Sequence, residues 1–130
     1  DGMILINSLP GTISGNYYIV VKNRNSIETW SATAIDFSAI GTISYDFSTA
    51  VSQAFGNNLK YSGTDYLIWG GDATQDGIVD GSDMAAIDNA STATLTGYNA
   101  EDVNGDGIVD GSDMAMIDNN STITVQTSKP

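Results

Sequence analysis

The sequence predicts a mixed α+β protein, mainly an incomplete antiparallel β-sandwich followed by a small helical domain with two acidic loops. Three observations lead to this prediction. Short runs rich in Ile, Val, Thr, Tyr and Phe recur through residues 1–70, separated by Gly, Asn, Ser and Pro. The string DGIVDGSDMA then occurs at 76–85 and again at 106–115. Charge divides the chain at the same place, because eleven of the sixteen acidic residues lie between Asp72 and Asp118.

The first half contains about five candidate strands. In one of them Ile43, Tyr45 and Phe47 alternate with polar residues, which is typical of a strand with one solvated face. Residues 52–58 are expected to form a short helical turn that ends at Gly56. A sandwich needs about seven strands to close its core, so we expect this one to be incomplete. The expected strands are 3–6, 16–23, 29–38, 41–48 and 66–69.

The second half contains two twelve-residue stretches, 72–83 and 102–113, with the ligand spacing of an EF-hand calcium loop. Such a loop places side-chain oxygens at positions 1, 3, 5, 9 and 12 and a backbone carbonyl at position 7. Glycine stands at position 6 of both stretches, where the chain must turn sharply. The expected ligands are Asp72, Thr74, Asp76, the carbonyl of Ile78, Asp80 and Asp83 in the first loop, and Asp102, Asn104, Asp106, the carbonyl of Ile108, Asp110 and Asp113 in the second.

These ligand sets favour calcium. Four carboxylates in one short loop repel one another unless a cation is present, and a flexible all-oxygen set suits Ca²⁺ better than Zn²⁺, Cu²⁺ or Mg²⁺. We therefore expect two Ca²⁺ ions per chain. The second loop is expected to bind more tightly, because Asn104 offers a carbonyl oxygen where Thr74 offers a shorter hydroxyl. The alternative is that the Asp-Gly and Asn-Gly clusters are ordinary surface turns, but two loops in register favour the metal site.

A helix is expected after each loop. Ser82 and Ser112 stand where an N-cap is needed, and a Met-x-x-Ile spacing in each helix predicts a buried stripe. Val79 and Val109, at loop position 8, are expected to pair with each other between the loops. No amphipathic helix precedes either loop. The helices are expected over 83–91 and 113–121, with stripes of Met84 and Ile87, and of Met114 and Ile117.

This order of loop and helix, repeated once, resembles a dockerin type I domain, the duplicated calcium-loop-plus-helix module of secreted bacterial assemblies. The resemblance covers residues 71–122, leaving 123–130 as a C-terminal tail. It implies a recruitment role through a cohesin-like receptor. Cohesin-binding dockerins, however, carry longer, often basic and leucine-rich helices, whereas this chain has MAAIDNASTA and MAMIDNNSTI.

The stretch NYYIVVKNRNSIETWS at 16–31 resembles a strand and turn of a prealbumin-like or Cna B-like β-sandwich module. In large secreted bacterial surface proteins such a module precedes a dockerin-like repeat, which implies an extracellular or cell-surface location. The segment GMILIN at 2–7 is apolar on both faces, as expected for a strand covered on each side. We expect it to complete the sandwich of a neighbouring copy, giving a homo-oligomer or filament; the alternative is an internal strand of a self-contained sheet.

Composition excludes several other functions. The net charge is −12, with only Lys22, Arg24, Lys60 and Lys129 opposing sixteen acidic residues, so nucleic acid and anionic membranes are not expected partners. No apolar run is long enough to insert into a membrane. The absence of His and Cys, and of nucleophile-elbow or phosphate-loop motifs, predicts a non-catalytic chain. Carbohydrate binding through Trp30, Trp69 and the six tyrosines is an alternative, although such aromatics in a β-rich chain more often belong to a core.

Overall fold

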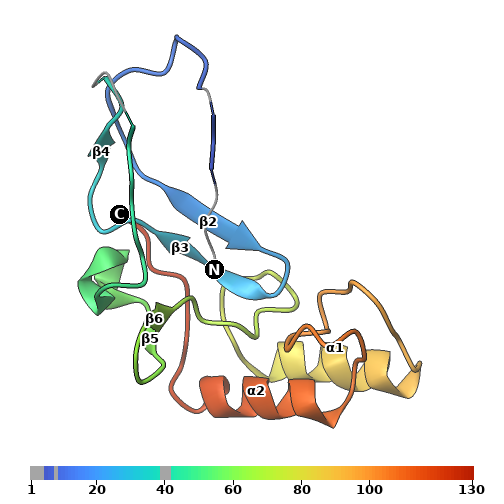
Figure 1. Cartoon of the computed structure of the whole chain (residues 1–130). Coiled ribbons are helices and arrows are strands. Elements are labelled where there is room, and N and C mark those ends of the chain that lie inside the picture. The colour runs from blue at the N-terminus through green and yellow to red at the C-terminus, as the bar shows by residue number, and fades with distance from the viewer. Residues whose placement is uncertain (1–4, 8, 39–41) are drawn as a thin grey trace.

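The computed structural model describes residues 5–7, 9–38 and 42–130. The α+β class is confirmed, because the chain forms small antiparallel sheets followed by two helices (Figure 1). Each sheet has two strands, and no closed sandwich forms within the described residues. The pairs are β1 (Asn16–Tyr17) with β4 (Ile35–Asp36), β2 (Val20–Asn23) with β3 (Ser26–Trp30), and β5 (Lys60–Tyr61) with β6 (Tyr66–Leu67).

The β2–β3 hairpin is the largest of these sheets. Its register shifts between Val21 and Asn23, which is an irregularity of the bulge type next to the turn. The other edge of β3 is bound by later parts of the chain, since Ile27 N donates to Trp69 O at 3.1 Å and Ser31 forms a bridge with Ala54. β3 is therefore hydrogen-bonded along both edges, and its core side is buried. β2 pairs only with β3 among the described residues.

The strands expected over 16–23 and 29–38 are each interrupted, at 18–19 and at 31–34, and two other expected strands do not form in the described residues. Residues 42–48 form no strand, although Ile43, Tyr45 and Phe47 are less exposed than Thr42, Ser44 and Asp46, as the alternation predicts. Within the described residues no strand pairs with this segment. The Tyr45 hydroxyl holds it by donating to Gln53 O at 2.5 Å, and Ser48 O accepts from Tyr66 N at 2.9 Å. Of the expected strand at 3–6, the first two residues lie outside the described ranges, and Leu5 and Ile6 are irregular and exposed.

The helical turn expected at 52–58 consists of two short 3₁₀ turns, η1 (Val51–Gln53) and η2 (Phe55–Asn57). Gly56 lies inside the second turn with φ of 68°, a conformation that glycine adopts without strain.

The two long helices are α1 (Gly81–Thr92) and α2 (Gly111–Ser121). The expectation that Ser82 and Ser112 cap them is wrong, because Asp80 and Asp110 are the N-caps. Each cap carboxylate accepts from the serine amide two residues later, and the third helical residue, an aspartate, accepts from the cap amide. An aspartate placed directly before the helix satisfies an orphan amide better than a serine already inside it.

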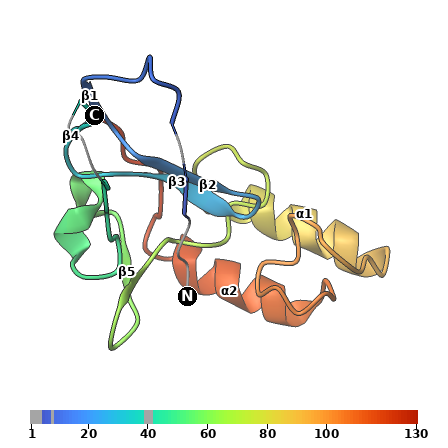
Figure 2. The same cartoon turned by 45° about the horizontal axis from the view of Figure 1, so that its top comes forward.

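The core lies between the helices and the hairpin (Figure 2). The expected stripes are confirmed, since Ile87 and Ile117 are fully buried and Met84 and Met114 pack against them. Ile27 of β3 is buried in the same cluster, so the hairpin and the helices share one core. Full burial of one such side chain is worth about 1.5–3 kcal/mol. The fully or largely buried members are Ile27, Val79, Ile87, Ala90, Val109, Ile117 and Val125.

Val79 and Val109 do not bond to each other, contrary to expectation. Val79 N donates to Val125 O at 2.8 Å, and Val109 N donates to Leu95 O at 3.1 Å. Val125 follows α2 and Leu95 follows α1, so each loop pairs with the segment after the other loop's helix. This exchange links the two repeats and gives the segment 123–130 a place in the core.

Candidate metal centre

The two acidic loops have the same hydrogen-bonded frame, which the last aspartate of each loop organises. Asp83 is fully buried, and its Oδ1 accepts from Thr74 N and its Oδ2 from Asp80 N, both at 2.9 Å. One carboxylate thus ties loop positions 3, 9 and 12 together. In the second loop the buried Asp113 accepts from Asn104 N and Asp110 N, both at 3.0 Å.

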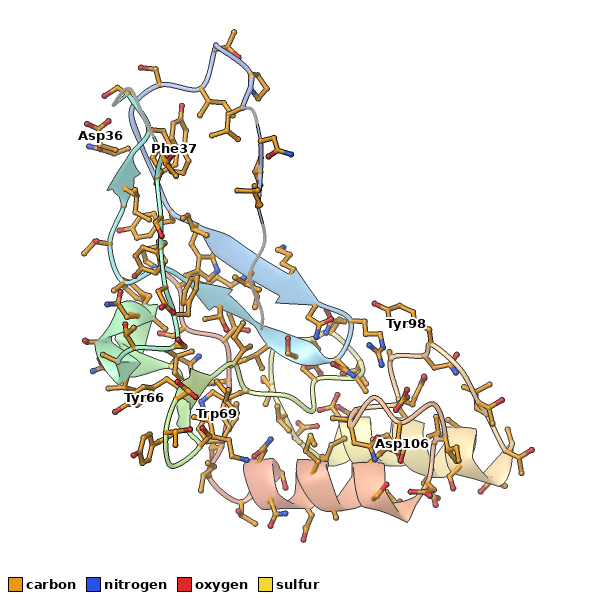
Figure 3. All side chains as sticks on the ribbon, viewed as in Figure 1. Asp36, Phe37, Tyr66, Trp69, Tyr98 and Asp106 are labelled. Atoms are coloured by element: carbon orange, nitrogen blue, oxygen red, sulfur yellow. The ribbon has the colours of Figure 1, made fainter. Side chains whose placement is uncertain are left out.

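The middle of each loop is shaped by aspartates that accept from the amide two residues later. Asp76 Oδ1 accepts from Ile78 N at 3.0 Å, and Asp106 Oδ1 accepts from Ile108 N at 2.9 Å; Figure 3 labels Asp106 beside the helices. Near the end of the loops, hydrogen bonds from the Ser82 and Ser112 side chains and amides hold the pKa values of Asp80 and Asp110 below their usual range. Both carboxylates are therefore ionised at neutral pH.

Loop position 3 is Thr74 in the first loop and Asn104 in the second, and the two side chains form different hydrogen bonds. Thr74 Oγ1 donates to Asp83 Oδ1 at 3.0 Å, so this hydroxyl is directed at the last carboxylate of its loop. Asn104 Oδ1 accepts from Asp106 N at 2.8 Å, and its Nδ2 donates to Ser112 Oγ at 2.7 Å. Both side chains belong to the loop frame.

The first aspartate differs most between the loops. Asp72 is only 2% exposed; its Oδ2 accepts from Gly77 N at 3.1 Å, but its Oδ1 is buried without a hydrogen-bond partner. Burial raises the pKa of Asp72, and the nearby Asp83 and Asp76 charges raise it further. Asp102 is 3% exposed, and both of its oxygens accept amides, from Gly105 at 2.9 Å and from Gly107 at 3.2 Å.

A hard cation fits this arrangement. As the side chains stand, no three acidic groups in the described ranges come together at metal-binding distance, because most of the carboxylates face amides. A buried carboxylate oxygen without a partner is costly, however, and a cation is the partner that an ionised oxygen lacks. The oxygen-only ligand set matches Ca²⁺ in chemistry. The groups that would hold it are those expected from the sequence, including the backbone carbonyls of Ile78 and Ile108.

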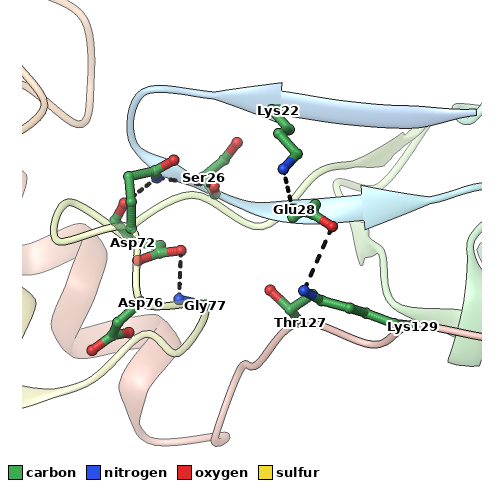
Figure 4. A pocket seen from close by; sticks show the side chains of 9 residues that line it. Lys22, Ser26, Glu28, Asp72, Asp76, Gly77, Thr127 and Lys129 are labelled. Carbon is green, nitrogen blue, oxygen red and sulfur yellow. Dashed lines mark hydrogen bonds and ion pairs between the residues drawn. The ribbon is translucent and has the colours of Figure 1, made fainter.

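A polar cavity of about 160 Å³ borders the first loop (Figure 4). It lies between the hairpin, the loop and the C-terminal segment, and the hydroxyls of Ser26 and Thr127 on its wall have no partner. Lys22 Nζ lies 2.7 Å and Lys129 Nζ 3.7 Å from the Glu28 carboxylate, and the Lys22 contact is the main cause of the lowered pKa of Glu28. At about 30 Å³ per water, the cavity has room for several waters beside Asp72.

Sequence reasoning missed Arg24, which lies in the hairpin turn. Arg24 Nη2 donates to Asp102 O at 2.8 Å and lies 3.5 Å from Asp102 Oδ2, while Nε donates to Asn99 O at 2.6 Å. Its guanidinium carbon stands 4.1 Å from the centre of the Tyr98 ring, labelled in Figure 3. Tyr98 is 82% exposed, and its ring covers the guanidinium. The only signal in the sequence was a lone arginine between two strand-like runs.

Comparisons with protein-family models, curated proteins and solved structures found no match to this chain. None of the helices in its described ranges has the length and apolar character needed to cross a membrane.

Proposed function

We propose that this chain is a non-catalytic, extracellular, calcium-binding structural module whose two loops each hold one Ca²⁺ ion. The observation that carries the proposal is the buried Oδ1 of Asp72, an ionisable oxygen without a partner at the first ligand position of the first loop. The second loop has the same frame of backbone bonds around its own aspartates. Outside cells calcium is abundant enough to fill loops of modest affinity.

The residues of the loops connect the site to the core. Asp83 and Asp113 hold the loop ends together, and Val79 and Val109, placed between ligand positions, are buried against both helices. A bound Ca²⁺ would supply the positive charge that the four carboxylates of each loop lack. Closing each loop therefore fixes both the N-terminus of the helix that follows it and the buried valine within it, Val79 or Val109. A ligand that binds only the folded state stabilises it by mass action.

Thermal unfolding with and without calcium tests this function. We expect the melting temperature of the wild-type chain to rise with Ca²⁺ and to fall again when a chelator is added. The variant Asp76→Ala, which removes an exposed carboxylate from the first loop, should lose part of this rise. The control Asp65→Ala removes an exposed carboxylate outside the loops and should keep the whole rise. A wild-type melting curve that ignores both calcium and chelator would contradict the proposal.

We further propose that the module assembles into a surface filament, in which an incomplete β-sandwich over 1–70 accepts a strand from a neighbouring copy and the dockerin-like repeat over 71–122 stabilises each subunit. Two observations favour this role. Leu5 is 75% and Ile6 66% exposed, which is unusual for adjacent large aliphatic residues. β2, for its part, has a single strand neighbour in the described ranges, so its second edge offers backbone groups for pairing. Because donor and acceptor surfaces differ, such contacts propagate.

Sedimentation in the presence of calcium distinguishes this role from its alternatives. The wild-type chain should form oligomers that depend on concentration, and Leu5→Ser with Ile6→Ser should abolish them. The control Ile123→Ser, an exposed aliphatic residue near the other end of the chain, should leave them intact. A chain that stays monomeric at high concentration refutes assembly. A stoichiometric complex with a cohesin-like receptor would favour recruitment, and quenching of tryptophan fluorescence by polysaccharide would favour carbohydrate binding.

A further inference from the structure

The two loops are near-copies in sequence but differ in what surrounds their first aspartate. In the first loop the carbonyl of Asp72 accepts from Gln75 Nε2 at 2.7 Å, a neutral donor within the loop. In the second loop the carbonyl of Asp102 accepts from Arg24 Nη2 and Asn25 Nδ2, both at 2.8 Å, and both donors come from the hairpin turn. The equivalent backbone oxygen thus accepts from a side-chain amide in both loops, and in the second loop it accepts from a cation as well.

The same cation also reaches the Asp102 side chain. Arg24 Nη2 lies 3.5 Å from Asp102 Oδ2, with side-chain exposures of 21% for Arg24 and 4% for Asp102, so solvent screens this pair only partly. A guanidinium carries a delocalised positive charge and presents several donors in a fixed plane. The hydrogen bond to Asn99 O and the Tyr98 ring fix its orientation. Asp102 therefore has a permanent counter-charge in the absence of metal.

Asp72 has no such counter-charge. The cations that line the cavity beside it, Lys22 and Lys129, are both paired with Glu28. No ion pair to Asp72 is found in the described part of the chain, and its Oδ1 lacks even a neutral partner. Within the described residues, the first aspartate of the first loop thus has no protein cation beside it, whereas that of the second loop faces the guanidinium of Arg24 from the hairpin turn.

We propose that Arg24 sets the difference between the two calcium sites: it neutralises Asp102 before metal binds, keeps the loop 102–113 closed in the ion-free protein, and lowers the affinity of that loop for calcium. This inference rests on the proposed function of the loops. It reverses the ranking expected from the ligands alone, in which Asn104 makes the second loop the tighter site. It also gives the β2–β3 hairpin a role in calcium binding, because the cation that contacts the second loop, Arg24, lies in the hairpin turn.

Single-loop variants allow each site to be measured alone. Asp76→Ala leaves only the second loop competent, and Asp106→Ala leaves only the first. In the Asp76→Ala chain, Arg24→Gln replaces the cation by the neutral donor that the first loop uses. Calorimetry should then find calcium binding about tenfold tighter. This is the effect expected from removing a unit charge a few ångströms from the ion in a water-like medium. In the Asp106→Ala chain, Gln75→Arg adds a cation beside Asp72 and should weaken binding by a similar factor.

The control is Arg24→Gln in the Asp106→Ala chain, where the affinity of the first loop should not change. A second readout does not need calcium: Arg24→Gln should lower the melting temperature of the chelated wild-type chain, and Arg24→Lys, which keeps the charge, should lower it less. Unchanged or weaker calcium binding by the second loop after Arg24→Gln would overturn the inference while leaving the proposed function intact. If neither single-loop chain bound calcium, the proposed function itself would fail, and the inference with it.

Discussion

Replacing Asp72 with asparagine should stabilise the ion-free protein at neutral pH, although it removes a ligand of the proposed first site. The reason is the environment of this carboxylate, which is 2% exposed, has one oxygen without a partner, and lies near the charges of Asp83 and Asp76. An unsatisfied buried polar group costs about 1–3 kcal/mol. Asparagine has nearly the same shape and no charge, so a gain of about 1 kcal/mol is expected, since the new amide must still find a partner.

The matched substitution, Asp102→Asn, should have the opposite sign. Asp102 accepts two amides and faces Arg24, so loss of its charge removes favourable contacts. For a chain of this length about 1 kcal/mol corresponds to roughly 4 °C in melting temperature. In chelator, Asp72→Asn is expected to melt about 4 °C higher than wild type and Asp102→Asn several degrees lower.

Scanning calorimetry in chelator at several pH values provides the assay. Since the folded-state pKa of Asp72 is raised, its contribution to stability is fully present below the unfolded pKa of about 3.9 and is lost as pH rises through the folded value. The advantage of Asp72→Asn over wild type should therefore grow from about pH 4 towards neutrality. With calcium added, the order should reverse, because only the wild type keeps a charged ligand at position 72, whereas asparagine offers a neutral carbonyl oxygen. If Asp72→Asn destabilises the chelated protein at pH 7, the assignment of Asp72 as an uncompensated charge is wrong.

Three further substitutions probe the site and the core. Thr74→Asn should tighten calcium binding by the first loop, because the amide carbonyl reaches further than the hydroxyl; calorimetry on the Asp106→Ala chain measures this, and an unchanged affinity would argue against Thr74 as the weak ligand position. Ile27→Ala should destabilise the whole chain by about 2–5 kcal/mol, since Ile27 is fully buried in the core shared by hairpin and helices; separate melting of the two halves would contradict a shared core. Gly71→Ala should lower the melting temperature, because a Cβ would lie 2.9 Å from Val79 Cγ1 at a residue with φ of +117°; a neutral effect would show that the loop entry can shift.

Sequence patterns correctly predicted features that depend on residues close together in the chain. The Met-x-x-Ile spacing identified the buried face of each helix, and alternation identified the inward side chains of 42–48. Alternation does not determine whether a partner strand lies alongside, and in the part of the chain that the structure describes none pairs with 42–48, so the expected strand did not form. The caps were misassigned for a related reason. Asp80 and Asp110 are the helix caps, whereas the loop spacing predicts only a ligand role for them.

In the candidate metal site too, local features could be predicted from the sequence and contacts between distant residues could not. Ligand spacing within twelve residues is a local property, and the structure places the buried ends of both loops as a closed frame. The exchange of Val79 and Val109 partners and the contact of Arg24 with Asp102 involve residues far apart in sequence, 78 positions in the second case. No periodicity or motif encodes such contacts, because they depend on how the hairpin docks on the loops.

Titration of the chelated wild-type chain with Ca²⁺ in an isothermal calorimeter counts the calcium sites. We expect two ions per chain, a ratio of one for Asp76→Ala and for Asp106→Ala, and no binding when both substitutions are combined. Each loaded site should add about 2.7 kcal/mol of stability at a free calcium concentration one hundred times its dissociation constant. A wild-type ratio below two, or two sites that survive in the double variant, would contradict it.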